Sequence, residues 1–351
     1  MFLRNNNTVT LKKWGIIMII LYYKDHLNDR QNKPFIDYFE KNNIEYKTVS
    51  NLHDIKIKKN QKTYILVGIL DFFEVYLKYF FNKKVDIIYR ARGIVPEESF
   101  YRNNSYIKFL ILSLVEFIVL ILSDLVITVS LNQKNHYVKK YKLKTDKIFV
   151  LHNYLMNYKT NFNDSSNRKL EIVYVGGLAK WQKIDDLKSI FEKLSIVNEQ
   201  LEFLICAKQK NILEFKKKFK KIDNIKFESY SDYNALMERI SKSTVGIILR
   251  DNSKVNKCSS PFKIIDYINA QLPIIMTQNI GDYNEILKNQ DFIFELDKTI
   301  YTDANIKKIE SYILHAYSKK NKLKKNIRNF RVEKLDFAKE FSHILKNINF
   351  E

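Results

Sequence analysis

The sequence predicts an α/β protein built from two doubly wound, Rossmann-like halves. Three observations predict it. Apolar runs of strand length alternate with helix-like segments along the chain, and the polar stretch at 157–168 (NYKTNFNDSSNR) divides it near the middle. The length of 351 residues is enough for two hydrophobic cores. Hydrophobic residues make up 46% of the chain, which excludes general disorder despite its many lysines.

The first half contains apolar runs typical of buried parallel strands. A signal peptide is not favoured for the run at Trp14–Tyr23, because no small-residue cleavage site follows it. The longer apolar stretch Ile107–Val129 approaches the length of a membrane span, but Glu116 would be costly in mid-bilayer. We expect there a buried helix, Tyr106–Leu122, with an apolar surplus available to lipid, running into a strand. The strands are expected near Ile16–Tyr22, Glu45–Val49, Tyr64–Val67, Asp86–Arg90, Leu125–Val129 and Phe149–His152, and the other helices at Lys33–Asn42 and Phe72–Phe81.

The second half repeats the alternation of strands and helices and ends in a helical tail at residues 305–347. Its strands are expected near Glu171–Val175, Glu202–Cys206, Ile225–Glu228, Val245–Leu249 and Ile274–Met276. The expected organisation is therefore an N-terminal domain at 1–156, a linker at 157–168, a second domain at 169–304 and C-terminal helices at 305–351.

The most informative local pattern lies at residues 246–282. An apolar strand ends in Arg250 and Asp251, and a polar loop then leads through Ser259-Ser260-Pro261 into a helix. The first N–H groups of a helix lack intrahelical partners, so such an arrangement is suited to hold phosphate. Ser259 or Ser260 would be the N-cap, with Pro261 in the first turn. A lysine in that turn, Lys263, is unexpected unless an anion binds there, so the pattern indicates a nucleotide-linked substrate.

The same residues resemble the C-terminal signature of family-4-type, GT-B-fold glycosyltransferases, particularly those that make bacterial surface polysaccharides. Two further segments resemble this family in the expected order. Residues 173–186 (VYVGGLAKWQKIDD) resemble the strand, Gly-Gly loop and helix that open the donor-binding domain, and residues 91–98 (ARGIVPEE) resemble a motif of the N-terminal domain. The signature residues are Arg250, Asp251, Asn256, Ser260, Pro261, Lys263, Asp266 and Tyr267.

The resemblance implies a GT-B fold, in which two Rossmann-like domains face each other across a cleft and C-terminal helices cross back to the first domain. It implies transfer of a sugar from a nucleotide-diphosphate sugar to a lipid-linked saccharide, with retention of configuration, during capsule or O-antigen assembly. The implied catalytic residues are Arg250, Lys263 and Asp251. Donor-binding roles fall to Gly176, Gly177, Lys180, Asn256, Ser260, Pro261, Asp266 and Tyr267, and acceptor-side roles to Arg92 and Glu98.

No Asp-x-Asp lies between apolar strands, so we expect no metal cofactor. The diphosphate would be held by Lys263 and Arg250 with backbone amides of Gly176, Gly177, Ser260 and Phe262. The chain departs from the family pattern at Gly177 and Gln182, where relatives often carry Arg and Lys, and at Cys258, where a carboxylate is usual. Two structural interpretations stay open, an Arg250–Asp251 ion pair and a Lys263–Asp266 pair three residues apart on the helix.

The formal charge of +21, from 60 Lys and Arg against 39 Asp and Glu, predicts attraction to polyanions. No zinc-ligand spacing, RNP-like strand or helix-turn-helix favours nucleic acid. The two cysteines imply no disulfide framework. We therefore expect a cytoplasmic enzyme, peripheral on the anionic inner face of the plasma membrane. The alternatives are a nucleotide-sugar epimerase of the same fold and a non-enzymatic, basic nucleic-acid- or membrane-binding protein.

Overall fold

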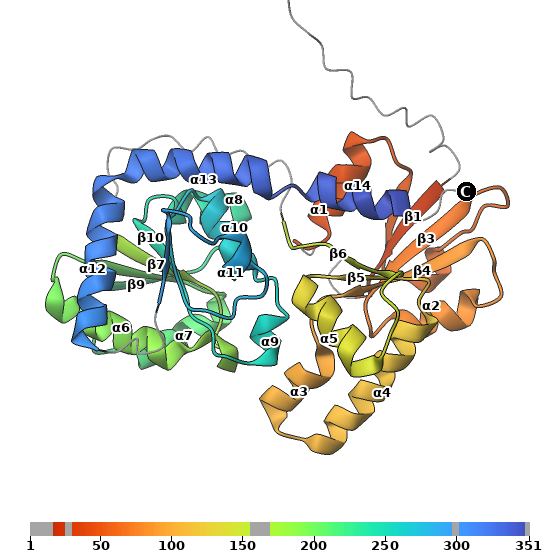
Figure 1. The fold of residues 1–351 in the computed structure, drawn as a ribbon, viewed down its shortest axis with the longest axis horizontal. Helices are drawn as coiled ribbons and strands as arrows, with labels where there is room; N and C mark the ends of the chain where they lie inside the picture. Colours follow the sequence, from red (N-terminus) through yellow and green to blue (C-terminus); the bar gives the residue numbers. More distant parts are fainter. Residues whose placement is uncertain (1–16, 25–29, 155–168, 297–301, 348–351) are drawn as a thin grey trace, which may run out of the picture. The chain divides into compact units, whose positions relative to one another are not determined.

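The computed structural model describes residues 17–24, 30–154, 169–296 and 302–347, which divide into two compact units (Figure 1). Unit 1 consists of Met1–Thr128, Tyr137–Leu151 and Phe341–Glu351, and unit 2 of Val129–His136 and His152–Glu340. The expected linker at 157–168 lies outside the described residues. The division differs from the expected one mainly in the short segment Val129–His136, which belongs to unit 2.

Unit 1 contains a six-stranded parallel sheet in the order β2-β1-β3-β4-β5-β6. Its central strands are almost fully buried, as expected for a sheet covered by helices on both faces. Leu21 of β1, for instance, pairs with Leu66 of β3 and is fully buried. The strands are β1 (Ile17–Tyr22), β2 (Tyr46–Val49), β3 (Lys62–Val67), β4 (Val85–Ala91), β5 (Leu125–Thr128) and β6 (Ile148–Val150).

The helices of unit 1 are amphipathic or apolar and connect these parallel strands. In α1 (Lys33–Lys41), a proline in the first turn starts the helix and Phe35, Tyr38 and Phe39 form the buried face. The side chain of Ser105 caps α4 by accepting a hydrogen bond from the Lys108 amide. The others are α2 (Phe72–Tyr79), α3 (Val95–Asn103), α4 (Tyr106–Leu122) and α5 (Leu131–Tyr141), the last spanning the boundary between units.

Helix α4 has the bounds expected from the sequence, but the expectation that it is a buried helix is wrong. Only Glu116, Val119 and Leu120 are buried, and they form the face toward the protein. The opposite face carries isoleucine and leucine side chains that are about half to three-quarters exposed. A purely apolar pattern cannot distinguish a helix buried all round from one with an apolar solvent face. No helix among the described residues is long and apolar enough to span a membrane.

Unit 2 contains a second parallel sheet, in the order β12-β11-β10-β7-β8-β9. The strands β7, β8, β9 and β11 match their expected bounds, whereas the edge strand β12 was not expected. Its apolar run, residues 292–294, is only three residues long and follows a polar turn, so the signal for a strand is weak. The strands are β7 (Glu171–Val175), β8 (Glu202–Cys206), β9 (Ile225–Glu228), β10 (Val245–Ile248), β11 (Ile274–Met276) and β12 (Ile293–Glu295).

The helices of unit 2 include the expected C-terminal ones, α12 and α13, and α14 extends the chain into unit 1. In α14, Phe341 packs edge-on against Phe35 and Tyr38 of α1, with ring centroids 5.1 Å apart in each pair. The expected return of the C-terminal helices to the first domain is therefore confirmed. The helices are α6 (Ile184–Val197), α7 (Gln209–Lys218), α8 (Tyr233–Ile240), α9 (Lys254–Lys257), α10 (Phe262–Asn269), α11 (Tyr283–Ile286), α12 (Asp303–Ser318), α13 (Lys320–Lys334) and α14 (Phe337–Asn347).

Candidate active site

The residues of the glycosyltransferase-like motif meet at the carboxyl ends of two neighbouring strands of unit 2. Strand β7 delivers the Gly176-Gly177 loop, and its neighbour β10 delivers Arg250 two residues after its end. Helix α10 then places Lys263 in its first turn, as expected from the sequence. This edge of a parallel α/β sheet is where ligands bind in doubly wound folds.

Two cations share one neutral acceptor at this edge. The Arg250 Nη1 and Lys263 Nζ groups each donate a hydrogen bond of 2.5 Å to the same Gln182 Oε1. The Tyr174 hydroxyl donates to the same oxygen at 3.3 Å, and Lys263 Nζ lies 3.8 Å from the centroid of the Tyr174 ring. We call Tyr174, Gln182, Arg250 and Lys263 the cation cluster.

Gly176 makes room for the cation cluster. A Cβ at this position would lie 2.4 Å from Cε and 2.6 Å from Nζ of Lys263. The φ of Gly176, +149°, is also one that side chains disfavour. Gly176 therefore lets the lysine pass over the loop. Its own amide donates to the Cys206 carbonyl at 2.9 Å, so the prediction that this amide binds a diphosphate is wrong.

The cation cluster carries positive charge that no ion pair balances within the described part of the chain. Burial, with the Arg250 charge, holds the pKa of Lys263 well below its usual value, and burial lowers the pKa of Arg250 to about 10. Asp266 Oδ1 accepts from the Tyr233 hydroxyl instead, so the Lys263–Asp266 ion pair does not form. The two cations are thus held close together in a poorly solvated site, where an anion would be strongly stabilised.

Asp251 does not form an ion pair with its neighbour Arg250, which was the other structural interpretation. Its Oδ1 accepts from the Ser253 amide at 3.2 Å and from Asn256 Nδ2 at 2.5 Å. Asn256 is 1% exposed and its carbonyl also accepts from the Gly281 amide. Asp251 and Asn256 therefore shape the loop between β10 and α10.

The start of α10 differs from the expectation. Pro261 occupies the N-cap position and no side chain caps the helix, so the prediction of Ser259 or Ser260 as N-cap is wrong. Ser259 donates to the Asn256 carbonyl, and Ser260 Oγ accepts from the Asn153 amide at 3.0 Å. Helix N-terminal amides left without a capping side chain remain available to a ligand.

Tyr267 lies in the core beneath the site and joins the two strands that carry it. Its hydroxyl donates to the Ile247 carbonyl at 2.9 Å and accepts from the Val175 amide at 3.1 Å. A Cβ on Gly246 would lie 2.5 Å from the Tyr267 ring, so that glycine is needed for the close approach. Lys180, by contrast, is exposed and is not one of the residues that bond to Gln182.

A partly buried histidine lies where the chain passes between the units. His152 Nδ1 is 2.9 Å from Glu340 Oε1, and His152 Nε2 is 2.9 Å from Asp282 Oδ2. Burial by itself lowers the pKa of His152, but the hydrogen bonds to the two carboxylates outweigh it and raise the pKa to about 9. The imidazolium form therefore ties residue 152 to residue 340 at neutral pH.

We expect this tie to make stability depend on pH. Because the folded pKa of about 9 exceeds the unfolded value of 6.5, its contribution is full below pH 6.5 and is lost as pH rises through 9. The contribution is on the order of 3 kcal/mol. Urea unfolding of the wild type and of His152→Gln from pH 5.5 to 9.5 measures it. The variant should be less stable at low pH and approach the wild type near pH 9.5; a gap independent of pH would contradict the assignment.

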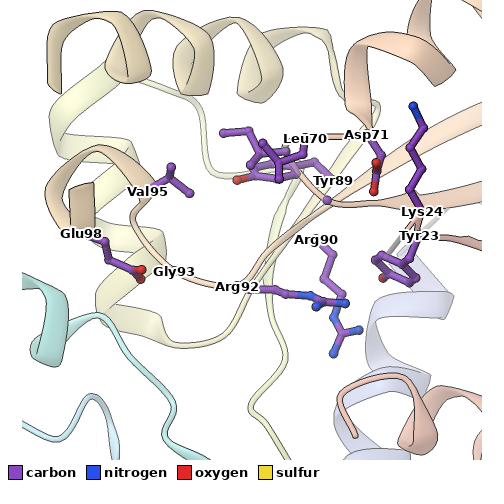
Figure 2. Close-up of a pocket in the computed structure, with 12 residues that line it drawn as sticks. Tyr23, Lys24, Leu70, Asp71, Tyr89, Arg90, Arg92, Gly93, Val95 and Glu98 are labelled. Carbon is purple, nitrogen blue, oxygen red and sulfur yellow. The ribbon is translucent and has the colours of Figure 1, made fainter. Parts of the chain in front are cut away.

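Unit 1 has a cavity of about 470 Å³ at the carboxyl ends of β1, β3 and β4 (Figure 2). The two expected acceptor-side residues, Arg92 and Glu98, both line it. Arg90 and Arg92 approach the same Asn32 Oδ1, at 2.9 and 3.5 Å, and stack on the rings of Phe35 and Tyr23 respectively. The cavity therefore combines guanidinium groups with aromatic surface.

Glu98 lies against the backbone of Gly93 in this cavity (Figure 2). A Cβ on Gly93 would lie 2.2 Å from Glu98 Oε1, so the glycine allows the carboxyl group to reach the loop. Burial raises the pKa of Glu98, and Arg102, 3.6 Å away, opposes that change. A carboxyl group of this kind can accept a hydrogen bond from a sugar hydroxyl.

Sequence reasoning missed two members of the cation cluster. Tyr174 looks like an ordinary core residue of an apolar strand, and nothing in the sequence indicates its contact with Lys263. Gln182 was noted only as a departure from the family pattern. The available signal was that departure, because an amide there supplies an acceptor to Arg250 and Lys263. Among the residues with described positions, no group of three or more His, Cys, Asp or Glu side chains could hold a metal ion.

Comparison with known proteins agrees with this geometry. Residues 159–332 match the model of the family "Glycosyl transferases group 1". No curated protein sequence matches the chain significantly. Among solved structures, HepE from Anabaena, in complex with UDP and glucose, has a TM-score of 0.65 at 10% identity, over 95% of this chain and 99% of that one.

Two other solved structures have the same fold. A TarM variant from S. aureus, in complex with fondaparinux, alpha-GlcNAc-glycerol and UDP, has a TM-score of 0.60 at 12% identity. The match covers 82% of this chain, which spans only 55% of that TarM chain. WaaG, a glycosyltransferase involved in lipopolysaccharide biosynthesis, has a TM-score of 0.61 at 10% identity, over 96% of this chain and 100% of that one. Residues 159–332 thus match the family model of the glycosyl transferases of group 1, and the chain has the fold of the GT-B glycosyltransferases.

Proposed function

We propose that the protein transfers a sugar from a nucleotide-diphosphate sugar to a saccharide acceptor, and that the cation cluster binds the diphosphate. The observation that carries the proposal is that two buried cations, Arg250 and Lys263, share a single amide oxygen. A diphosphate would replace that weak acceptor with several charged ones. The UDP bound to HepE and to TarM supports the nucleotide class.

In this mechanism the cation cluster acts on the leaving group. The bond from the anomeric carbon to the β-phosphate oxygen breaks, a bond to an acceptor hydroxyl oxygen forms, and the hydroxyl proton leaves with the diphosphate. Arg250 and Lys263 would stabilise the negative charge that develops on that phosphate. They supply the positive charge for which other enzymes use a divalent cation, so we propose a metal-independent reaction, with retention as the family resemblance implies.

The acceptor would bind at the cavity of unit 1. Its arginines and aromatic rings suit a saccharide that carries a phosphate, as a lipid-linked saccharide does, and Glu98 can accept from a hydroxyl. Two of the similar structures support an acceptor of this kind. WaaG is involved in lipopolysaccharide biosynthesis, and the TarM variant is in complex with alpha-GlcNAc-glycerol. We propose accordingly a role in bacterial surface polysaccharide synthesis, such as capsule or O-antigen, on the cytoplasmic face of the membrane.

Thermal stabilisation by nucleotides tests the donor site directly. We expect one of UDP, GDP or ADP to raise the melting temperature selectively, with CMP as the control nucleotide, and to do so equally with and without a chelator. Ligand at 100 times its Kd should contribute about 2.7 kcal/mol. If none of the nucleotides raised the melting temperature, the result would contradict the donor site. If a chelator abolished the shift, the result would contradict metal independence.

A further inference from the structure

Helix α4 is apolar on most of its surface, and one of its apolar faces points to solvent. The exposed residues recur every three or four positions, as one face of a helix requires. At a rise of about 1.5 Å per residue, the helix is about 25 Å long. Exposed fractions are 74% for Ile107, 58% for Ile111 and 60% for Leu114. The exposed apolar side chains of α4 are Tyr106, Ile107, Leu110, Ile111, Leu114 and Ile121.

The one carboxylate of α4 faces the protein. Glu116 is fully buried and accepts hydrogen bonds from the Tyr137 hydroxyl at 3.2 Å, the Tyr141 hydroxyl at 2.8 Å and the Val95 amide at 3.3 Å. Lys140 Nζ lies 3.7 Å from Glu116 Oε2. These contacts hold the helix in one rotation about its axis, so the apolar face stays outward.

Helix α2 lies on the same face of the sheet and also carries exposed apolar side chains. The strands β3, β4 and β5 follow one another in the sheet, and right-handed crossovers place α2 and α4 on the same face of it. Leu77 is 79% exposed, and Phe80 and Phe81 just beyond α2 are 55% and 91% exposed. Exposed apolar surface of this extent marks an interaction site rather than ordinary solvent surface.

Basic residues border this surface at both ends. Arg102 and Lys108 are exposed where α3 meets the start of α4. Lys83 and Lys84 are exposed beyond the end of α2, at the sheet edge where α4 also ends, and they outnumber the exposed Asp124 there. No exposed carboxylate lies on the outward face of α4 itself, among its described residues. An apolar strip with a cationic border is complementary to an anionic lipid surface, with its acyl interior and negative headgroups.

We propose that α4 and the end of α2 form a bilayer-docking face that lies in the headgroup region of an anionic membrane. The helix has 17 residues, fewer than the about 20 of a typical span, and its buried glutamate keeps one side on the protein, so it would lie on the membrane without crossing it. This deepens the proposed function, on which it rests for its biological role. Helix α3 connects the cavity to α4. Its Glu98 lines the acceptor cavity, and its Phe100 packs on Phe109 of α4. A lipid-linked acceptor would therefore reach the cavity from the docking face.

Sedimentation with vesicles tests the proposal on the full chain. The probes are vesicles of phosphatidylglycerol and phosphatidylcholine in equal parts, and vesicles of phosphatidylcholine alone. We expect the wild type to bind the anionic vesicles, more weakly in high salt, and the double variant Ile107→Glu/Leu114→Glu to bind at least about tenfold more weakly. The matched control, Ile196→Glu/Leu213→Glu, changes residues 81% and 64% exposed on helices of unit 2 and should bind like the wild type.

Three results would overturn the proposal. The wild type could fail to bind anionic vesicles, the two double variants could bind equally, or the wild type could form a dimer in solution that Ile107→Glu/Leu114→Glu dissociates without any vesicle binding. The last result would assign the face to a second copy of the chain. Nucleotide-induced thermal shifts of the same variants separate this test from the donor site, because the substituted residues of α4 lie in unit 1 and the cation cluster in unit 2.

Discussion

Replacing Lys263 with methionine should abolish transfer while leaving the fold intact or more stable. The lysine is buried and forms no ion pair with a carboxylate of the described residues, so an apolar side chain of similar shape removes a desolvation cost. We expect stability to stay the same or rise by up to about 2 kcal/mol. The same change removes a charged donor to the diphosphate, so kcat/KM should fall by at least about 100-fold.

The opposite signs of the two effects make this prediction specific. Unfolding in urea gives the stability, and calorimetric titration with the nucleotide from the thermal screen gives the affinity. Lys257→Met is the matched control, since this exposed lysine of α9 belongs to the same loop region and should change neither quantity. Unchanged nucleotide affinity in Lys263→Met would contradict the proposed donor site.

Replacing Phe341 with alanine should have the largest effect on stability. Its ring is 2% exposed and packs on Phe35, Tyr38 and Phe39, so the change removes the aromatic contact that joins α14 to α1. Truncating a buried phenylalanine costs about 3 to 5 kcal/mol. We expect unit 1 to unfold at a lower urea concentration than unit 2, with faster hydrogen exchange in α1.

Val332→Ala on α13 is the control for this change. Its side chain is 76% exposed, so we expect an effect within about 0.5 kcal/mol. The measurement is circular dichroism through a urea titration, with hydrogen exchange to locate the weakened segment. If both variants unfold like the wild type, α14 does not contribute to the core of unit 1.

The fold could be predicted because buried parallel strands appear in the sequence as runs of consecutive apolar residues. Residues 17–22 and 202–206 are buried on both faces of their sheets, so nearly every position is apolar and the strand is visible without an alignment. The edge strand β12 has a neighbour on one side only, and its apolar run, residues 292–294, is just three residues long. The rotation of α4 was also hidden, because it depends on which residues bond to Glu116.

The candidate site was predictable in part for a similar reason. Lys263 stood out because a cation in a first helical turn opposes the helix dipole, and the structure places it in the cation cluster. Tyr267 was assigned to the donor, yet its hydroxyl bonds to the backbone of two strands. A tyrosine that joins strands and one that touches a ligand have the same sequence signature. Only the path of the neighbouring chain distinguishes them.

The return of α14 to unit 1 has a consequence for how the protein is made. A ribosome synthesises all of residues 152–340 before it reaches Phe341, and the aromatic contacts of α1 with Phe341 cannot form until then. Every residue of unit 2, by contrast, precedes that point. The residues of unit 2 are therefore all present before Phe341 is added, whereas unit 1, with its candidate acceptor cavity, cannot close its core until then.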